Sequence, residues 1–379
     1  MAPLRTQIIT EAEELEALSE PWRELAHVCA CPAALPGWQL AWWRHLAPEG
    51  SLLRAVAVFE GEALVGIAPF FVNPGRRVDY RLLGAANTHR ISPLAAPGRE
   101  REIAALIARA LAGSSPSPDL IAFEGVDAAS LWPQIFVENW PGRFRPWRYV
   151  SSIHTAPVLD LELEGGFEKW LAARSGNFRR QIARARRQLE AEGGSARLAL
   201  DPDAIKQATE AFGDLHFRRW ERRGGSGLGR SVPAFLEDAA ADLVGRGEMR
   251  LWVVELDGEP LCVSAFLAAG GEVYFFNSGF AGSRGDLKPG VLALFAAVED
   301  AFARGEHRVD LGGGAHSYKL RFTADSAPIF WTGLVPRTRR YLLTRMRLAP
   351  DQAGWMATRI ARKLPPQWRR RIKRVIRRT

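Results

Sequence analysis

Cysteine is scarce in this sequence, which holds only Cys29, Cys31 and Cys262 among its 379 residues. An odd and sparse set provides no disulfide framework and is typical of a protein kept in a reducing cytoplasm. The stretch "HVCACP" places His27 beside two of these thiols, but no second ligand pair follows at zinc spacing. We therefore expect structural thiols and no metal site.

Long uninterrupted apolar runs are also missing. Stretches such as "RAVAVFEGEALVGIAPFFV" are broken by charge or glycine well before about 18 residues, so we expect no transmembrane helix. The opening stretch, "MAPLRTQIITEAEELEALSE", carries early acids and no apolar segment, which argues against a secretory signal. The sequence thus predicts a cytoplasmic protein, long enough for two domains.

Positive charge is concentrated at the C-terminal end. Residues 336–379 contain fifteen Lys or Arg against one acid, a net of +14, which leaves −5 for the rest of a chain whose total is +9. A mildly acidic body argues against a general nucleic-acid binder. The apolar residues of "ARKLPPQWRRRIKRVIRRT" recur at helical spacing, which favours peripheral contact with an anionic membrane, with RNA or an acidic protein as alternatives.

Two stretches 197 residues apart are alike. "LRAVAVFEGEALVGIAPFF" (53–71) and "RLWVVELDGEPLCVSAFLA" (250–268) each predict a hairpin around an acid-Gly-Glu turn. Around both, the pattern predicts helix–helix–hairpin–strand–helix–strand. We therefore expect an α/β fold of two tandem units, each with a mixed, largely antiparallel sheet flanked by helices.

A strand–loop–helix joint in the second copy predicts an anion site. "EVYFFNSGF" is an aromatic-rich strand, and Pro289-Gly290 opens the following helix. Lys288 lies just before the helix N-terminus, where partial positive charge attracts anions. The next strand, "HRVDLGGG", lacks the context of a dinucleotide loop or a Walker A motif. Its glycines predict a wide turn, with Tyr318 and Lys319 pointing back into the gap between the two strands.

The segment "SGNFRRQIARARRQLEAEGG" (175–194) predicts an amphipathic helix. Asn177 is the expected N-cap and Gly193 the expected end. Most of its arginines are expected to be solvated, whereas Arg179 lies beside the apolar stripe. That stripe is formed by Phe178, Ile182, Ala185 and Leu189.

These motifs together resemble the CelD-type acetyltransferases of the GNAT superfamily, which are akin to the FemAB aminoacyl transferases. The resemblance is strong over about residues 160–325 and weaker before them. It implies a degenerate GNAT-like domain over 1–155, a GNAT acyltransferase domain over 156–335 and a basic tail over 336–379. The matching stretches are "RSGNFRRQIARARRQLEAEG", "LHFRRW", "LDGEPLCVSAFL", "KPG" and "DLGGGAHSYKLRF".

The resemblance also implies a site. Acetyl-CoA would lie as co-substrate between the splayed strands 272–280 and 307–312, with its pyrophosphate at the start of the helix that begins at Pro289. The stretch before that helix, "RGDLKPG", only approximates the phosphate-binding loop of the superfamily. The expected donor-binding residues are Asn277, Ser278, Lys288, Pro289, Gly290 and Val291, and the expected acceptor contacts are Arg174, Arg179 and Trp220.

The implied reaction is direct N- or O-acetyl transfer to a saccharide or another precursor bearing an amine or hydroxyl. Asp310 and His216 are the candidate bases, while Tyr318 and Lys319 would protonate the leaving thiolate or stabilise negative charge. Packing is an equal alternative for His216. Two other functions stay open, a FemAB-like aminoacyl transferase that uses aminoacyl-tRNA and a non-catalytic scaffold of the same fold.

Overall fold

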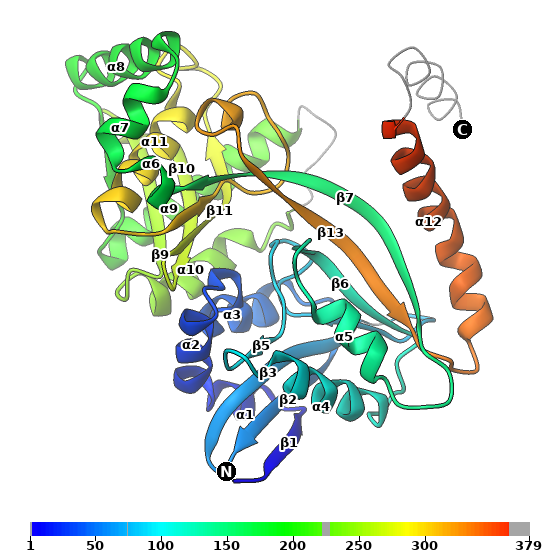
Figure 1. Ribbon diagram of the computed structural model, residues 1–379. Coiled ribbons are helices and arrows are strands. Elements are labelled where there is room, and N and C mark those ends of the chain that lie inside the picture. Colours follow the sequence, from blue (N-terminus) through cyan, green and yellow to red (C-terminus); the bar gives the residue numbers. More distant parts are fainter. Residues whose placement is uncertain (1, 74, 222–227, 364–379) are drawn as a thin grey trace.

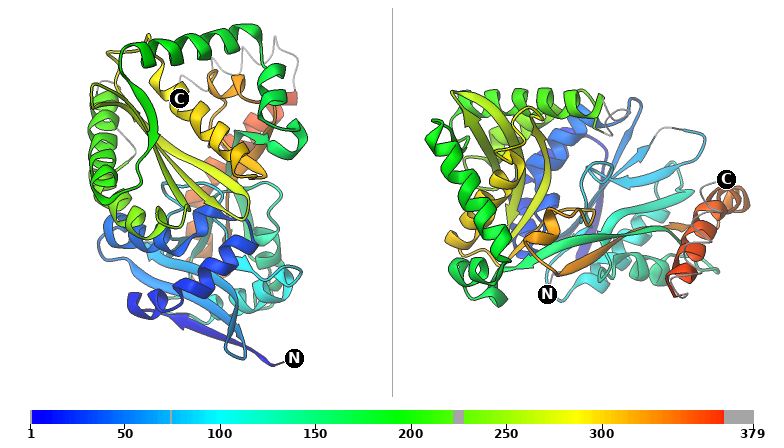
Figure 2. Two further views of the ribbon diagram at one scale, coloured as in Figure 1. Left: turned by 90° about the vertical axis from the view of Figure 1, so that its left-hand side faces the viewer. Right: turned by 90° about the horizontal axis from the view of Figure 1, so that it is seen from above.

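The protein forms two lobes joined by long strands. The computed structural model describes residues 2–73, 75–221 and 228–363. Strands β7 (Trp147–Asp160) and β13 (Ser326–Val335) run from one lobe to the other, and α12 (Tyr341–Lys363) stands along the outer side of β7 (Figure 1). The turned views separate the lobe built from the first half of the chain, in blue and cyan, from the green and yellow lobe (Figure 2).

The first lobe is built on a sheet with helices packed against it. Its strands are β1 (Leu4–Ile9), β2 (Leu52–Glu60), β3 (Ala63–Asn73), β4 (Asp79–Leu82), β5 (Leu94–Ala95) and β6 (Leu120–Asp127). Its helices are α1 (Ala12–Glu16), α2 (Ser19–Val28), η1 (Pro32–Ala34), α3 (Pro36–Leu46), α4 (Glu100–Ala112) and α5 (Trp132–Asn139).

The second lobe repeats this plan with more helices. Its strands are β8 (Ser195–Leu198), β9 (Met249–Leu256), β10 (Glu259–Ala269), β11 (Glu272–Phe280) and β12 (Arg308–Asp310). Its helices are α6 (Leu161–Glu164), α7 (Phe167–Ala173), α8 (Gly176–Ala191), α9 (Pro202–Glu221), α10 (Val232–Leu243), α11 (Pro289–Ala303) and η2 (Lys319–Arg321).

One path of hydrogen-bonded strands runs through both lobes. Its order is β1-β2-β3-β4-β6-β13-β7-β12-β11-β10-β9-β8, with β5 paired to β3. β13 lies between β6 and β7, and the end of β7 pairs with β12. The predicted domain boundary at residue 155 falls within β7, and β13, assigned to the second domain, pairs with a strand of the first lobe. Placing the boundary there stays a prediction.

The predicted internal repeat is confirmed in its order of elements. In the first lobe, α2 and α3 precede the β2–β3 hairpin, β4, α4 and β6; in the second, α9 and α10 precede the β9–β10 hairpin, β11, α11 and β12. In both, the strand after the hairpin pairs in parallel with the strand after the helix. Local periodicity sets each element, and parallel pairing requires the helical crossover.

Helix α8 forms as its periodicity predicts. All four residues of the expected apolar stripe are buried. The predicted N-cap was wrong by two residues, because Ser175 caps the helix by accepting the backbone N–H of Phe178 at 3.2 Å. Asn177 instead accepts a side-chain hydrogen bond from Gln181. Gly193, with φ of +80°, follows the C-cap Glu192 in the left-handed region that favours glycine.

The lobes share one hydrophobic core and a buried ion-pair network. Trp38 of α3 packs edge-on against Phe235 of α10 and Phe276 of β11, with ring centroids 4.5 and 4.8 Å apart. Arg23 of α2 pairs with Asp242 at 2.7 Å and with Glu248. Apolar burial and paired charges therefore hold the two lobes in one arrangement.

A close approach at Gly279 fixes α9 against β11. A Cβ added there would lie 2.5 Å from the carbonyl oxygen of Phe212. Gly279→Ala is therefore expected to lower the free energy of unfolding by about 1–3 kcal/mol, because backbone must move to admit the methyl group. Urea unfolding measures the change. Gly282→Ala, where a Cβ would meet nothing within 4 Å, is the matched control, and equal effects of the two substitutions would contradict this packing.

Candidate active site

Strands β11 and β12 separate to form an opening in the sheet. They pair in parallel over only three residues each, ending at Tyr274 and Asp310. β11 continues along β10 to Phe280, whereas β12 stops and the chain turns into Gly312-Gly313-Gly314. Neighbouring strands that diverge leave backbone and side chains facing a gap, which is where the sequence predicts the site.

The three glycines permit close contacts on both sides of this turn. Gly312 has φ of +73°, and a Cβ there would lie 2.9 Å from the carbonyl oxygen of Phe275. A Cβ on Gly313 would lie 2.9 Å from Cε1 of His89. His89 of the first lobe therefore lies against the glycine turn of the second lobe. This close contact explains why glycines occupy the turn.

Lys319 lies buried at this turn. Its Nζ donates hydrogen bonds to the carbonyl oxygens of Gly312 and Gly313 at 3.3 and 3.0 Å, and it lies 5.4 Å from the centre of the Phe275 ring. Burial lowers the pKa of Lys319 to about 8, although the negative charge of Asp310 opposes this shift. The ammonium group is thus held in place and titrates near physiological pH.

Asp310 is held in an ion pair with Arg90 of the first lobe. The carboxylate is 2% exposed and also accepts the backbone N–H of Gly312 at 2.6 Å. Arg90 contacts Asp127 as well and donates to the carbonyl oxygen of Ala327 at 3.2 Å. These contacts favour a positioning role for Asp310, since both of its carboxylate oxygens are already engaged.

His89, next to Arg90, is a second contribution from the first lobe. Burial lowers its pKa to about 4, so the imidazole is neutral at pH 7. Its backbone N–H donates to the Tyr274 hydroxyl at 3.1 Å, and its ring meets Trp331 edge-on at 5.2 Å. Within the described residues, its buried Nδ1 has no hydrogen-bond partner. Neither His89 nor Arg90 was predicted, because the loop "NTHRISP" shows no motif.

The other two predicted catalytic residues lie in different surroundings. His216 on α9 is 2% exposed, stacks on Phe212 at 5.7 Å and places Nδ1 3.4 Å from the Ser278 carbonyl oxygen. Burial lowers its pKa, and these contacts favour its packing role. Tyr318 stacks on His316 at 6.1 Å, and burial raises its pKa to about 12. Tyr318 therefore stays protonated at neutral pH.

The start of α11 gathers positive charge. Lys288, in the left-handed region with φ of +49°, precedes Pro289, and Val291 N–H donates back to the Lys288 carbonyl at 2.9 Å. The Lys288 ammonium donates to Oε1 of Gln181 at 2.8 Å. Arg321 donates to the same oxygen at 2.8 Å. Two cations thus lie beside a helix N-terminus, an arrangement suited to a phosphate.

A cavity of about 550 Å³ adjoins this helix end. The Arg219 guanidinium lies 3.8 Å from the centre of the Phe280 ring, and a Cβ on Gly290 would lie 3.6 Å from Cδ1 of the same ring. The sequence pointed to Trp220, one residue beyond Arg219, and did not single out Arg219 or Phe280. The lining residues are Leu215, Arg218, Arg219, Phe280, Ala281, Gly282 and Ser283.

The remaining predicted residues are spread around these features. Arg174 donates to the Phe322 carbonyl at 2.8 Å and pairs with Glu164, which favours a structural role. Arg179 lies on the exposed basic face of α8, and Trp220 is half-buried 6.0 Å from the His216 ring. Asn277 and Ser278 lie on β11 beyond its pairing with β12, where the Asn277 side chain accepts the Ser278 N–H at 2.8 Å.

Comparisons with known proteins agree with this geometry. Residues 176–320 match the family model described as "Acetyltransferase (GNAT) domain". This match covers the opening between β11 and β12, the start of α11 and the glycine turn. No curated protein sequence matches the chain.

Several solved structures share the fold at low sequence identity. FemX is 11% identical, with 89% of this chain and 99% of FemX covered at a TM-score of 0.59. The C-terminal domain (DUF2156) of a putative lysylphosphatidylglycerol synthetase from Agrobacterium fabrum is 10% identical, with 89% and 96% covered at 0.54. A conserved protein of unknown function from Bacteroides thetaiotaomicron VPI-5482 is 10% identical, with 89% and 100% covered at 0.54.

The fold and the family match define a class. The protein has a mixed α/β, GNAT-like fold of two tandem units, with a large, mostly antiparallel sheet flanked by helices. Residues 176–320, which lie in the second unit, match the model of the acetyltransferase (GNAT) domain.

Proposed function

We propose that this protein is an acyl-CoA-dependent acetyltransferase of the CelD type, acting on the amine or hydroxyl of a saccharide or similar precursor. The observation that carries the proposal is the opening between β11 and β12, with Lys288 and Arg321 held at the start of the adjacent α11. A CoA pyrophosphate suits those cations, and a thioester suits the narrow end of the opening.

The residues of the opening suit direct transfer. The donor supplies an activated acyl group on a thiol leaving group. Protonated Lys319, fixed by two backbone carbonyls, would stabilise the thiolate as the bond between carbon and sulfur breaks. Arg90 and Asp310 would hold the glycine turn in place, and Tyr318 would give a proton to the departing sulfur. Of the two bases predicted for the acceptor's proton, Asp310 is engaged by Arg90 and His216 is stacked on Phe212, so either would have to leave those contacts to take the proton.

Calorimetric titration with acetyl-CoA and CoA tests the donor site. Gly290→Glu is expected to weaken binding by at least about tenfold, because it places a carboxylate where a phosphate would lie. Gly290→Gln adds the same bulk without charge, and a Cβ at Gly290 would make only ordinary van der Waals contact with the Phe280 ring. We expect the glutamine variant to bind much more tightly than the glutamate variant. Absence of wild-type binding by folded protein would contradict an acyl-CoA donor.

A FemAB-like aminoacyl transferase is the second candidate. Its supporting observations are the likeness to FemX and the basic face of α8, where Arg179, Arg180, Arg184 and Arg187 line an open groove of about 880 Å³. Such a groove suits a phosphodiester backbone. Aminoacyl-tRNA that competes with CoA, or that donates its aminoacyl group where acetyl-CoA does not, would favour this candidate. Binding without turnover of either donor would favour the scaffold.

A further inference from the structure

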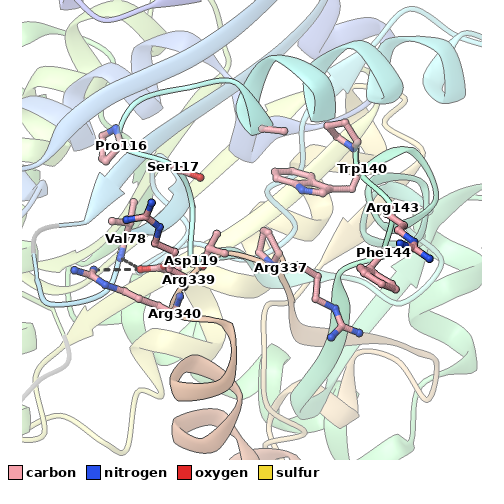
Figure 3. A pocket seen from close by; sticks show the side chains of 15 residues that line it. Val78, Pro116, Ser117, Asp119, Trp140, Arg143, Phe144, Arg337, Arg339 and Arg340 are labelled. Atoms are coloured by element: carbon pink, nitrogen blue, oxygen red, sulfur yellow. Dashed lines mark hydrogen bonds and ion pairs between the residues drawn. The ribbon is translucent and has the colours of Figure 1, made fainter.

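A cavity lined by arginines lies at the base of α12, and Figure 3 shows its side chains from close by. None of its lining residues belongs to β11, β12 or the glycine turn. Its volume is about 830 Å³. The chain forms it where β13 ends and α12 begins, together with the loops before β6 and β7. We call it the arginine pocket; its charged lining residues are Arg143, Arg337, Arg339, Arg340 and Asp119.

The single acid of the arginine pocket is fully engaged. Asp119 is 4% exposed and accepts hydrogen bonds from the Thr338 hydroxyl at 2.9 Å and the Val78 N–H at 3.1 Å. Arg340 also reaches it, at 3.4 Å. The carboxylate thus neutralises one arginine, and its hydrogen bonds hold the turn that presents the others.

Arg143, Arg337 and Arg339 form no ion pair with a carboxylate of the described ranges. Arg337 lies over the rings of Tyr341 and Phe144 at 4.2 and 5.6 Å, and Arg143 lies over Phe144 at 5.5 Å. Stacking on a ring fixes a guanidinium while leaving its N–H edge available. The pocket therefore presents oriented donors suited to a phosphodiester anion.

Helix α12 has two apolar faces, and only one is packed. Tyr341, Thr344 and Leu348 are buried, and Gln352 accepts the backbone N–H of Val150 of β7 at 2.7 Å. A second face, turned by about 115° from the packed one at 100° per residue, carries large apolar side chains in solvent. We call it the outward stripe; it consists of Leu342, Met346, Met356 and Ile360, which are 71%, 72%, 50% and 59% exposed.

The outward stripe runs along the helix, with only Ala349 and Ala353 on the same face between Met346 and Met356, where Pro350 lies inside the helix. At 100° per residue its four members fall within an arc of about 80°, over about 27 Å of helix. Exposed Arg345 lies beside one edge of it, exposed Arg347 lies about 100° beyond the other edge, and Asp351 is the one acid in the sequence of α12. No helix of the described chain is long and apolar enough to cross a bilayer. An apolar stripe on a helix whose charged residues are mostly arginine is the pattern of a helix that lies in a membrane interface.

We propose that the arginine pocket and the outward stripe together form a docking surface for an anionic bilayer. Phosphodiester head groups occupy the pocket, and the stripe enters the boundary between head groups and acyl chains. Charge complementarity favours this occupant over a second copy of the chain, whose identical arginines would repel. Nucleic acid would leave the stripe exposed. The earlier prediction from "ARKLPPQWRRRIKRVIRRT" concerns residues 361–379, of which 364–379 lie outside the described ranges.

Co-sedimentation of the full chain with vesicles tests this surface. Vesicles of equal parts phosphatidylglycerol and phosphatidylcholine are compared with vesicles of phosphatidylcholine alone. Leu342→Glu/Met346→Glu is expected to lower partitioning onto the anionic vesicles by at least about tenfold, because two carboxylates replace the leading apolar contacts. Leu163→Glu/Leu200→Glu is the matched control, since both leucines are exposed elsewhere and are expected to have no effect. Circular dichroism checks folding, and Met356→Glu serves as the fallback variant.

A second pair of variants tests the arginine pocket. Arg337→Gln/Arg339→Gln is expected to weaken binding to anionic vesicles by about tenfold or more, at about 1 kcal/mol for each arginine near the surface. Arg101→Gln/Arg230→Gln, at exposed arginines elsewhere, is its control. Wild-type binding by Leu342→Glu/Met346→Glu would overturn the proposal. Displacement of the protein from vesicles by millimolar inorganic phosphate would also overturn the proposal, because it would assign the surface to a soluble anion. A change from dimer to monomer in the Leu342→Glu/Met346→Glu variant would overturn it as well, because it would assign the surface to self-association.

Discussion

Replacing Lys319 by methionine is expected to lower the rate of acyl transfer by about 10²–10³-fold while the protein stays folded. The physical reason is the loss of a fixed cation at the place where negative charge develops on the leaving sulfur. Steady-state kinetics with the acyl donor in excess measures the change, and calorimetry of CoA binding serves as its control. Unchanged turnover in a variant that still binds CoA would remove Lys319 from the chemistry.

The pH dependence of the rate distinguishes two roles for Lys319. The pKa is lowered to about 8, so the cation is lost as pH rises through that value. A role that requires the cation predicts that kcat/KM falls above about pH 8. Lys319→Arg keeps the charge, and its alkaline decline is expected to move well above that pH. A wild-type rate that rises through pH 8 would instead make the neutral amine a base.

Replacing Arg90 by alanine is expected to lower the free energy of unfolding by about 3–5 kcal/mol. The substitution leaves Asp310, which is 2% exposed, buried without its cation, and removes the contacts of Arg90 with Asp127 and the Ala327 carbonyl. Urea unfolding gives the difference. Arg218→Ala, which breaks an exposed pair with Asp214, is the control and should cost at most about 1 kcal/mol.

A double variant shows whether the loss of stability in Arg90→Ala comes from leaving Asp310 without its partner. Arg90→Ala/Asp310→Asn removes the stranded charge and should recover part of the lost stability, because a neutral amide is cheaper to bury than an unpaired carboxylate. If Arg90→Ala alone lowers the free energy of unfolding by less than about 1 kcal/mol, the ion pair between Arg90 and Asp310 does not stabilise the contact between the lobes.

The elements that local patterns control were predictable from the sequence. The two hairpins, the helix that begins at Pro289 and the buried stripe of α8 all follow from periodicity and turn residues within one stretch of chain. The separation of β11 from β12 was expected from the resemblance to the CelD-type acetyltransferases. The glycine turn beside it was predicted from the three glycines of "DLGGGAHSY".

The contacts between the lobes were not predictable in this way. Arg90 and Asp310 are 220 residues apart, and neither stretch carries a pattern that names the other. The same holds for His89 against Gly313 and for β13 between β6 and β7. A charged side chain in a loop carries no periodic signal, so its partner is fixed only when the chain is folded.

Hydrogen exchange of the backbone amides with and without CoA locates the acyl donor on the chain. We predict slowed exchange at residues 290–292 of α11 and along 275–280 of β11 when CoA is bound. Little change is predicted for the arginine pocket at 337–340. Protection confined to the arginine pocket or to α8, with none at the start of α11, would contradict a donor site between β11 and β12.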